Sequence, residues 1–281
     1  MKAAPAGDLT LTFLDDAGTE IRTFTSKGDN ARPVAPVNPL PDAGAGEEPQ
    51  TERDASLPAS DDEPRPTKAA GANRFVWDLR GPNATKLPDN KGRAGTVEAL
   101  AAPRVPPGRY QVRLTVGGRS VTQPFEVAKD PRIAATDADL REQYTWAKKA
   151  HDLLTRVHDA VLRLRDVRAQ AEAWAKRVGT LKEAAGTLAA ALTAVEEELI
   201  TVRSDDPRMF PAKLNTRIAA IVTLIEYSDG APTAALRELC ENLALRAEME
   251  IAKLQRCVTE DVAAFNARCR DAGVAAIVPR P

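Results

Sequence analysis

The chain has little of what catalysis, export or membrane insertion usually requires. Its 281 residues include three cysteines, two histidines and 4% aromatic residues. It has no glycine-rich phosphate loop, no nucleophile elbow and no Cys/His cluster with zinc spacing. Neither a signal peptide nor a run of about eighteen apolar residues is present, so we expect no export signal and no membrane span. A formal net charge of -1 disfavours a nucleic-acid partner.

The cysteines and histidines all fall within predicted helices. At a rise of about 1.5 Å per residue, neighbours among Cys240, Cys257 and Cys269 are roughly 18 to 25 Å apart, too far for a disulfide. We interpret them as buried thiols that act as small apolar residues. His151 and His158 are about 10 Å apart on one helix, too far to share a metal ion without other ligands. We interpret them as solvated residues or as residues at the edge of an apolar stripe.

Alternation of apolar and polar residues predicts two β-hairpins in the first half of the chain. Residues 9–24 form one of them, around turn-favouring residues. Residues 110–127 form the other, around Gly117 and Gly118, which tolerate the positive φ angles of a tight turn. Because Pro124 has no N–H group, we expect it at a sheet edge or a bulge.

A fifth strand is predicted over residues 74–79. Phe75, Trp77 and Leu79 alternate with other side chains, which is typical of a half-buried strand. The pair Trp77 and Asp78 is the candidate ligand contact, since aromatic rings stack on sugars, although the phase of Trp77 favours a core residue. Five strands predict an incomplete immunoglobulin-like antiparallel β-sandwich, which usually has seven.

Residues 28–70 interrupt this domain with eight prolines, seven clustered acidic residues after residue 46 and no aromatic residue. Such a segment cannot bury enough apolar surface to offset its ordering entropy, so we predict a disordered insertion. Binding a partner through this segment is the alternative. A second loop, residues 81–107, is expected to be partly ordered at best.

From Thr136 onward the pattern is helical, with apolar residues at three- and four-residue spacing. Thr136 is a candidate N-cap, and the helices have the order long, short, short and long. Because short connections favour antiparallel neighbours, the sequence predicts a four-helix bundle in which the two long outer helices extend as a stalk. The predicted helices are residues 137–178, 181–202, 212–227 and 233–271.

The run Glu196-Glu197-Glu198 is the only paired-carboxylate candidate that we single out. Consecutive helical residues point about 100° apart, so this run indicates a charged helix surface and not an acid/base pair. The sequence therefore predicts no catalytic, cofactor-binding or metal-binding residue.

Three motifs of the β-domain resemble the immunoglobulin-like module of flagellar hook-capping (FlgD-like) proteins. They are Asp-Ala-Gly-x-x-Ile-Arg-Thr-Phe, Asn-Arg-Phe-Val-Trp-Asp and Pro-Pro-Gly-x-Tyr-x-Val. Together with five further segments, these motifs resemble the C-terminal region of large bacterial proteins that carry sortilin-like BNR/Asp-box β-propellers. These segments are Asp130-Pro131-Arg132, residues 137–140, residues 227–233, Phe265-Asn266 and Gly273-Val274.

The resemblance implies a β-domain over residues 1–130 and an antiparallel helical bundle over residues 131–281, which together make an α+β protein. Proteins of this family are often labelled glycosyl hydrolases and are expected to be exported to the periplasm or beyond. Because the propeller is absent here, the resemblance implies a fragment, a split gene or a misplaced start codon.

These patterns lead to a leading hypothesis of a non-catalytic accessory module that packs on, or extends from, a β-propeller in cis or in trans. Two alternatives stay open. One is a subunit of a split propeller glycosidase or peptidase, and the other is a carbohydrate-binding sandwich with a helical spacer. A homodimer through a sheet edge or through the helical stalk is a further expectation.

Overall fold

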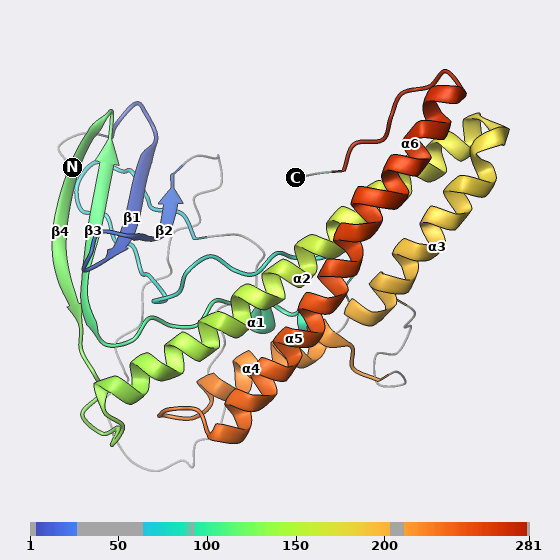
Figure 1. Cartoon of the computed structure of the whole chain (residues 1–281). Coiled ribbons are helices and arrows are strands. Elements are labelled where there is room, and N and C mark those ends of the chain that lie inside the picture. The colour runs from blue at the N-terminus through green and yellow to red at the C-terminus, as the bar shows by residue number, and fades with distance from the viewer. Residues whose placement is uncertain (1–3, 27–63, 89, 91–92, 203–210, 280–281) are drawn as a thin grey trace, which may run out of the picture. The chain divides into compact units, whose positions relative to one another are not determined.

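The computed structural model describes residues 4–26, 64–88, 90, 93–202 and 211–279. The chain divides into two compact units, which we describe separately. Unit 1 comprises Met1–Gly81 and Pro107–Ala128, and unit 2 comprises Pro82–Pro106 and Lys129–Pro281. Unit 1 contains an antiparallel sheet and unit 2 contains the long helices, so the predicted α+β class is confirmed (Figure 1).

Unit 1 is built on a four-stranded antiparallel sheet with the order β2-β1-β3-β4. Both predicted hairpins are present, and Gly117 and Gly118 adopt the expected positive φ angles of 56° and 77°. Pro124 lies in β4, an edge strand, where a missing N–H costs no ladder hydrogen bond on the open side. The strands are β1 (Leu9–Asp15), β2 (Glu20–Thr25), β3 (Gly108–Val116) and β4 (Arg119–Val127).

The predicted fifth strand is wrong in one respect. Residues 74–79 do show the expected alternation, with Phe75, Trp77 and Leu79 half-buried and their neighbours exposed, but they form no strand. The segment instead lies against the sheet through its aromatic rings, and the Phe75 and Phe24 ring centroids are 4.8 Å apart. Leu79 then takes a left-handed φ of 63°, which ends the extended run. Among the described residues, unit 1 has one four-stranded sheet, and this extended segment covers part of one of its faces.

Unit 2 contains the predicted long, short, short and long helices. The first begins at a capping box, in which the Thr136 hydroxyl accepts a hydrogen bond from the Asp139 N–H and the Asp139 carboxylate accepts one from the Thr136 N–H. The fourth runs through a π-helical turn, Cys257–Asp261, which leaves it continuous. The helices are α2 (Asp137–Arg177), α3 (Lys182–Leu199), α4 (Leu214–Glu226), α5 (Ala234–Arg256) and α6 (Val262–Asp271).

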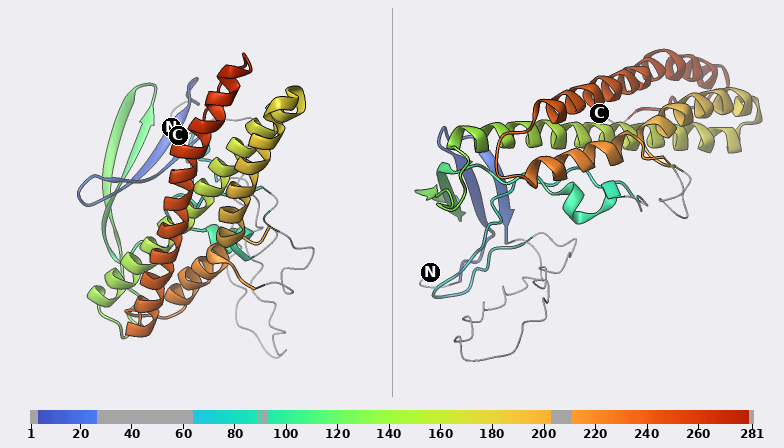
Figure 2. Two further views of the ribbon diagram at one scale, coloured as in Figure 1. Left: turned by 45° about the vertical axis from the view of Figure 1, so that its right-hand side comes forward. Right: turned by 90° about the horizontal axis from the view of Figure 1, so that it is seen from below.

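The arrangement of these helices corrects the predicted four-helix bundle. Figures 1 and 2 show α3 and α4 lying end to end along α2, while α5 and α6 form the third column of the unit. Helix α2, with 41 residues, is about 60 Å long, so both short helices fit along it. Helix α4 continues in the direction of α3. Unit 2 therefore has three columns of helices, which are α2, α3 with α4, and α5 with α6.

Residues 82–106 were expected to be a loop of the β-domain, and the structure instead places them in unit 2. This segment, which we call the strap, contains a 3-10 turn at Arg93–Gly95 and the one-turn helix α1 (Val97–Leu100). Its buried side chains belong to the same apolar core as those of the long helices. The strap residues that belong to this core are Ala84, Leu87, Ala94, Ala99 and Leu100.

The last described residues fold back onto the helices. Gly273, with a φ of 71°, ends α6 in a Schellman motif, in which the Val274 N–H donates to the Cys269 carbonyl oxygen. The Asn266 side-chain amide then exchanges two hydrogen bonds with the backbone of Ile277, at 2.8 and 3.0 Å. This places the Ile277 side chain in the core, where it is buried.

Most of the predicted insertion, residues 28–70, lies outside the described residues. None of the helices that the structure describes is long and apolar enough to cross a bilayer.

Candidate functional site

The three consecutive glutamates of α3 lie in different environments. Glu196 is fully buried, with a relative exposure of 0%, whereas Glu197 is half-buried and Glu198 is exposed. Glu196 is in phase with the buried residues Leu192 and Leu199, because four- and three-residue steps return to one helix face. The interpretation of the whole run as a charged surface is therefore wrong for its first member.

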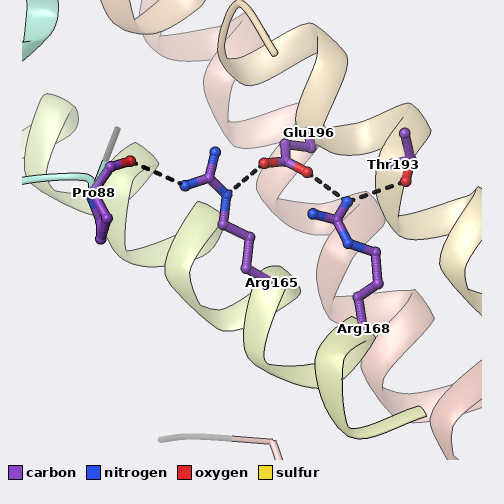
Figure 3. Close-up of polar contacts among 5 residues, drawn as sticks. All are labelled: Pro88, Arg165, Arg168, Thr193 and Glu196. Atoms are coloured by element: carbon purple, nitrogen blue, oxygen red, sulfur yellow. Dashed lines mark hydrogen bonds and ion pairs between the residues drawn. The ribbon is translucent and has the colours of Figure 1, made fainter. Parts of the chain in front are cut away.

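Two arginines of α2 bind the Glu196 carboxylate (Figure 3). The Arg165 Nε atom donates to Glu196 Oε1 at 2.6 Å, and the Arg168 Nη1 atom donates to Glu196 Oε2 at 2.6 Å. Because the arginines are three residues apart, they lie on one face of α2. Each carboxylate oxygen thus has its own cationic donor, which joins α2 to α3.

The same guanidinium groups make further contacts. Arg168 Nη1 donates to the Thr193 hydroxyl at 3.1 Å, and Arg165 Nη1 lies 3.4 Å from the Pro88 carbonyl oxygen of the strap. The side chains of Arg165 and Arg168 stay 30% and 24% exposed. We call these four side chains, Arg165, Arg168, Thr193 and Glu196, the charge cluster.

The charge cluster has the chemistry of a structural lock. A general acid needs a carboxyl group that can hold and release a proton near a substrate, but both oxygens of Glu196 are occupied by arginines and the side chain is buried. Hydrolysis of a glycosidic bond usually takes two carboxylates that flank the bond. Among the contacts described for the cluster, Glu196 supplies the only carboxylate.

The two histidines of α2 are buried, which corrects the expectation of solvated side chains. Each bonds to a backbone carbonyl of the strap. His151 Nε2 lies 3.3 Å from the Leu100 oxygen, and His158 Nδ1 lies 2.6 Å from the Thr85 oxygen. Burial lowers the pKa of both imidazoles below the ordinary value. In the described part of the chain, no group of three or more His, Cys, Asp or Glu side chains could hold a metal ion.

The candidate ligand contact, Trp77 and Asp78, lies in unit 1. The Trp77 ring stacks on Phe13 with centroids 4.2 Å apart, and its Nε1 donates to the Arg80 carbonyl oxygen at 2.9 Å. The Asp78 carboxylate accepts a hydrogen bond from the Arg80 N–H. One face of the Trp77 ring is therefore covered by the sheet, and both side chains serve to shape the end of the extended segment.

The three cysteines are free thiols, as predicted. Cys240 and Cys269 are buried, and burial raises the pKa of both thiols, so they are poor nucleophiles. Cys257 is half-buried in the π-helical turn.

Charged residues also meet at the junction of α2 and α3. An open hollow of about 510 Å³ lies there, lined by Glu172, Lys176 and Lys182. Small side chains make the hollow, and the residues that do so are Ala175, Ala185, Gly186 and Ala189.

Sequence reasoning missed both the charge cluster and the strap. The signal for Glu196 was its position in the apolar stripe of α3, between Leu192 and Leu199. The strap has no periodic pattern, so no comparable signal existed. Comparison with family models, curated proteins and solved structures gives no match for this chain in any of the three.

Proposed function

We propose that this chain is a non-catalytic interaction module whose sheet packs on a β-propeller domain or protein. The choice of partner follows the resemblance of three β-domain motifs and five further segments between residues 130 and 274 to the region that accompanies such propellers. An interaction surface needs shape and apolar area, and it does not need reactive side chains.

One row of apolar side chains across the sheet carries the proposal. Phe24, Leu11, Leu114 and Val121 are register partners on successive strands, so they share one face of the sheet. Phe24 is buried, but Leu114 is 36% exposed and Val121 is 60% exposed. The row becomes more exposed toward β4, and among the described residues its outer end is open.

The extended segment with Phe75 and Trp77 covers the other part of this face. These rings contact Phe13 and Phe24, while the Trp77 ring also lies 6.2 Å from the Phe125 ring. The face is thus half closed by the chain itself, and the open half is a surface that a propeller could cover. Burying an exposed valine or leucine contributes about 1.5 to 3 kcal/mol, which favours binding.

The edge of β4 is less suited to binding than the face. A partner strand would need the outward N–H groups of β4, and Pro124 in the middle of the strand has none. This supports docking through the face of the sheet, and it disfavours the expected homodimer through this edge.

Titration calorimetry tests the proposal with a purified sortilin-like Asp-box propeller. We expect binding by the wild-type chain and at least about ten-fold weaker binding by Val121→Lys, because a lysine in the interface removes apolar area and adds a charge to desolvate. Leu245→Lys, at an exposed position of α5, is the matched control and should bind as the wild type does.

Three results would argue against the proposal. Equal weakening by Val121→Lys and Leu245→Lys would show that the sheet face is not the docking site. Saturable hydrolysis of glycosides or peptides by the purified chain would favour the enzyme alternative. Glycan binding that Trp77→Phe abolishes without loss of folding would favour the carbohydrate-binding alternative.

A further inference from the structure

The strap connects the two units by an unusual route. The chain leaves unit 1 after Gly81, passes along unit 2 as Pro82–Pro106 and returns to unit 1 at Pro107. It enters unit 2 again at Lys129. The chain therefore passes between the units three times, and two of these passages are the ends of the strap.

A row of polar side chains on α2 holds the strap. His151, His158 and Arg165 are spaced by seven residues, so they follow one face of the helix. They contact three backbone carbonyl groups of the strap, those of Leu100, Thr85 and Pro88. The neighbouring Asp159 accepts a hydrogen bond from the Thr85 hydroxyl at 2.7 Å.

The contacts of the histidines fix their protonation. A carbonyl oxygen can only accept a hydrogen bond, so His158 Nδ1 and His151 Nε2 carry the protons that point at the strap. The other nitrogen of His158, Nε2, is buried without a hydrogen-bond partner in the described structure. A second proton on His158 would leave an unsatisfied N–H group and a positive charge in the core, and both are costly.

Charged groups near the histidines give His151 more support than His158. Asp152 Oδ1 lies 3.6 Å from His151 Nδ1, although the Asp152 side chain is half exposed, and Lys148 opposes it. Asp159 is the charged neighbour of His158. The charged side chains of the strap that the structure describes, Lys86, Glu98 and Arg104, are exposed, and those of α4 are the exposed Arg217 and the half-buried Glu226.

We propose that the strap is a proton-released clamp, in which protonation of His158 and His151 detaches residues 82–106 from α2. A docked strap excludes a second proton on His158, because Nδ1 faces the strap backbone and Nε2 is buried without a partner in the described structure. It disfavours a second proton on the buried His151 less strongly, because His151 Nδ1 lies 3.6 Å from Asp152 Oδ1. Release frees residues 82–106 from the long helices of unit 2, while the chain stays continuous at both ends of the strap and at residues 128–129. Protonation of His158 makes the larger contribution to release, since its Nε2 atom has no hydrogen-bond partner for a second proton in the described structure.

The expected size of the effect follows from linkage. A released histidine with an ordinary pKa of about 6.5 raises the opening equilibrium about ten-fold at pH 5.5, so two histidines raise it up to about 100-fold relative to neutral pH. Because the buried histidines are neutral in the docked state, docking of the strap is favoured above about pH 6.5 and is lost as the pH falls.

Hydrogen exchange of the strap amides tests the clamp. The Ala84 N–H donates to the Leu100 carbonyl oxygen, which His151 also contacts, and Ala84 is buried in the core of the long helices, so its protection reports docking. After correction for the intrinsic pH dependence of exchange, we expect protection to fall by up to about 100-fold between about pH 7.5 and 5.5. The amides of α3 should keep their protection and serve as the internal reference.

The matched variant is His151→Gln with His158→Asn, which keeps a side-chain N–H at each contact and removes both titrations. Its strap protection should not depend on pH. Equal pH dependence in the variant and the wild type would overturn the proposal.

Proton NMR of the wild-type chain is a second test, which does not depend on whether the variant docks its strap. The two histidines are the only ones in the sequence, so their ring signals are readily followed. We expect both to titrate together with the loss of strap protection. A histidine that titrates near pH 6.5 while the strap amides stay protected would also overturn the proposal.

Discussion

Replacement of Glu196 by glutamine tests whether the charge cluster is a structural lock. Glutamine keeps the shape of the side chain and one acceptor oxygen, but it turns the other oxygen into an NH₂ group that faces an arginine donor. Glu196 is fully buried and each of its oxygens binds an arginine at 2.6 Å. The substitution therefore removes the charge and one of the two hydrogen bonds.

The magnitude follows from these contacts. Breaking a buried ion pair costs about 3 to 5 kcal/mol when the remaining charge stays buried. Here Arg165 and Arg168 are 30% and 24% exposed and regain some water, which lowers the cost. We expect Glu196→Gln to lower the free energy of unfolding of unit 2 by about 2 to 3 kcal/mol.

Urea unfolding followed by far-ultraviolet circular dichroism measures this change, because the helices of unit 2 dominate the signal. Glu198→Gln is the matched control. Its side chain is 49% exposed and pairs with Lys213 at 3.2 Å, so we expect a loss below about 0.5 kcal/mol. Equal losses in the two variants would refute the lock.

A third variant separates lost charge from lost packing. Replacing Arg165, Arg168 and Glu196 together by methionine leaves no unpaired charge, and apolar replacements of buried ion pairs are often neutral or stabilising. We expect a stability within about 1 kcal/mol of the wild type. A triple variant as unstable as Glu196→Gln would show that the cost came from packing.

Two further predictions concern the ends of the two units. Trp77→Ala should destabilise unit 1 by about 2 to 3 kcal/mol, because it removes the ring stacked on Phe13, whereas Asp78→Ala at an exposed position should cost less than about 1 kcal/mol. Near-ultraviolet circular dichroism during urea unfolding measures both losses of stability. Equal losses in the two variants would contradict the packing role of Trp77. Ile277→Ala should release the C-terminal segment and speed its proteolysis at least about ten-fold, since truncating a buried isoleucine costs about 2 kcal/mol or more. Val278→Ala, at an exposed site, should leave the rate of proteolysis unchanged. A segment equally resistant to proteolysis in both variants would show that Ile277 does not anchor it.

The helices could be located from the sequence because their signals are local. A capping threonine at Thr136 and an apolar stripe predict α2, and the structure confirms its start at Asp137 and places its end at Arg177, one residue before the predicted end. The packing of α3 and α4 is not a local property. A connection between two helices is compatible with a reversal or with a continued direction, so the sequence could not exclude three columns.

The segment at residues 74–79 shows what a period of two does and does not establish. Alternation predicts an extended backbone with one covered face, and Phe75 and Trp77 do lie against the sheet. It carries no information about hydrogen bonds to a neighbouring strand, which depend on distant residues. The face of the side chains was therefore predictable, while membership of a sheet was not.

The row of polar side chains on α2 is needed because the strap has carbonyl groups that require hydrogen-bond donors. An irregular segment that is packed on a core cannot satisfy its carbonyl groups through a helix or a sheet ladder, so side-chain donors must do so. His151, His158 and Arg165 provide three such donors at seven-residue spacing. A row of polar donors within a long apolar stripe thus indicates a buried irregular partner, and the choice of histidine at two of the three positions is what makes that partner sensitive to protons.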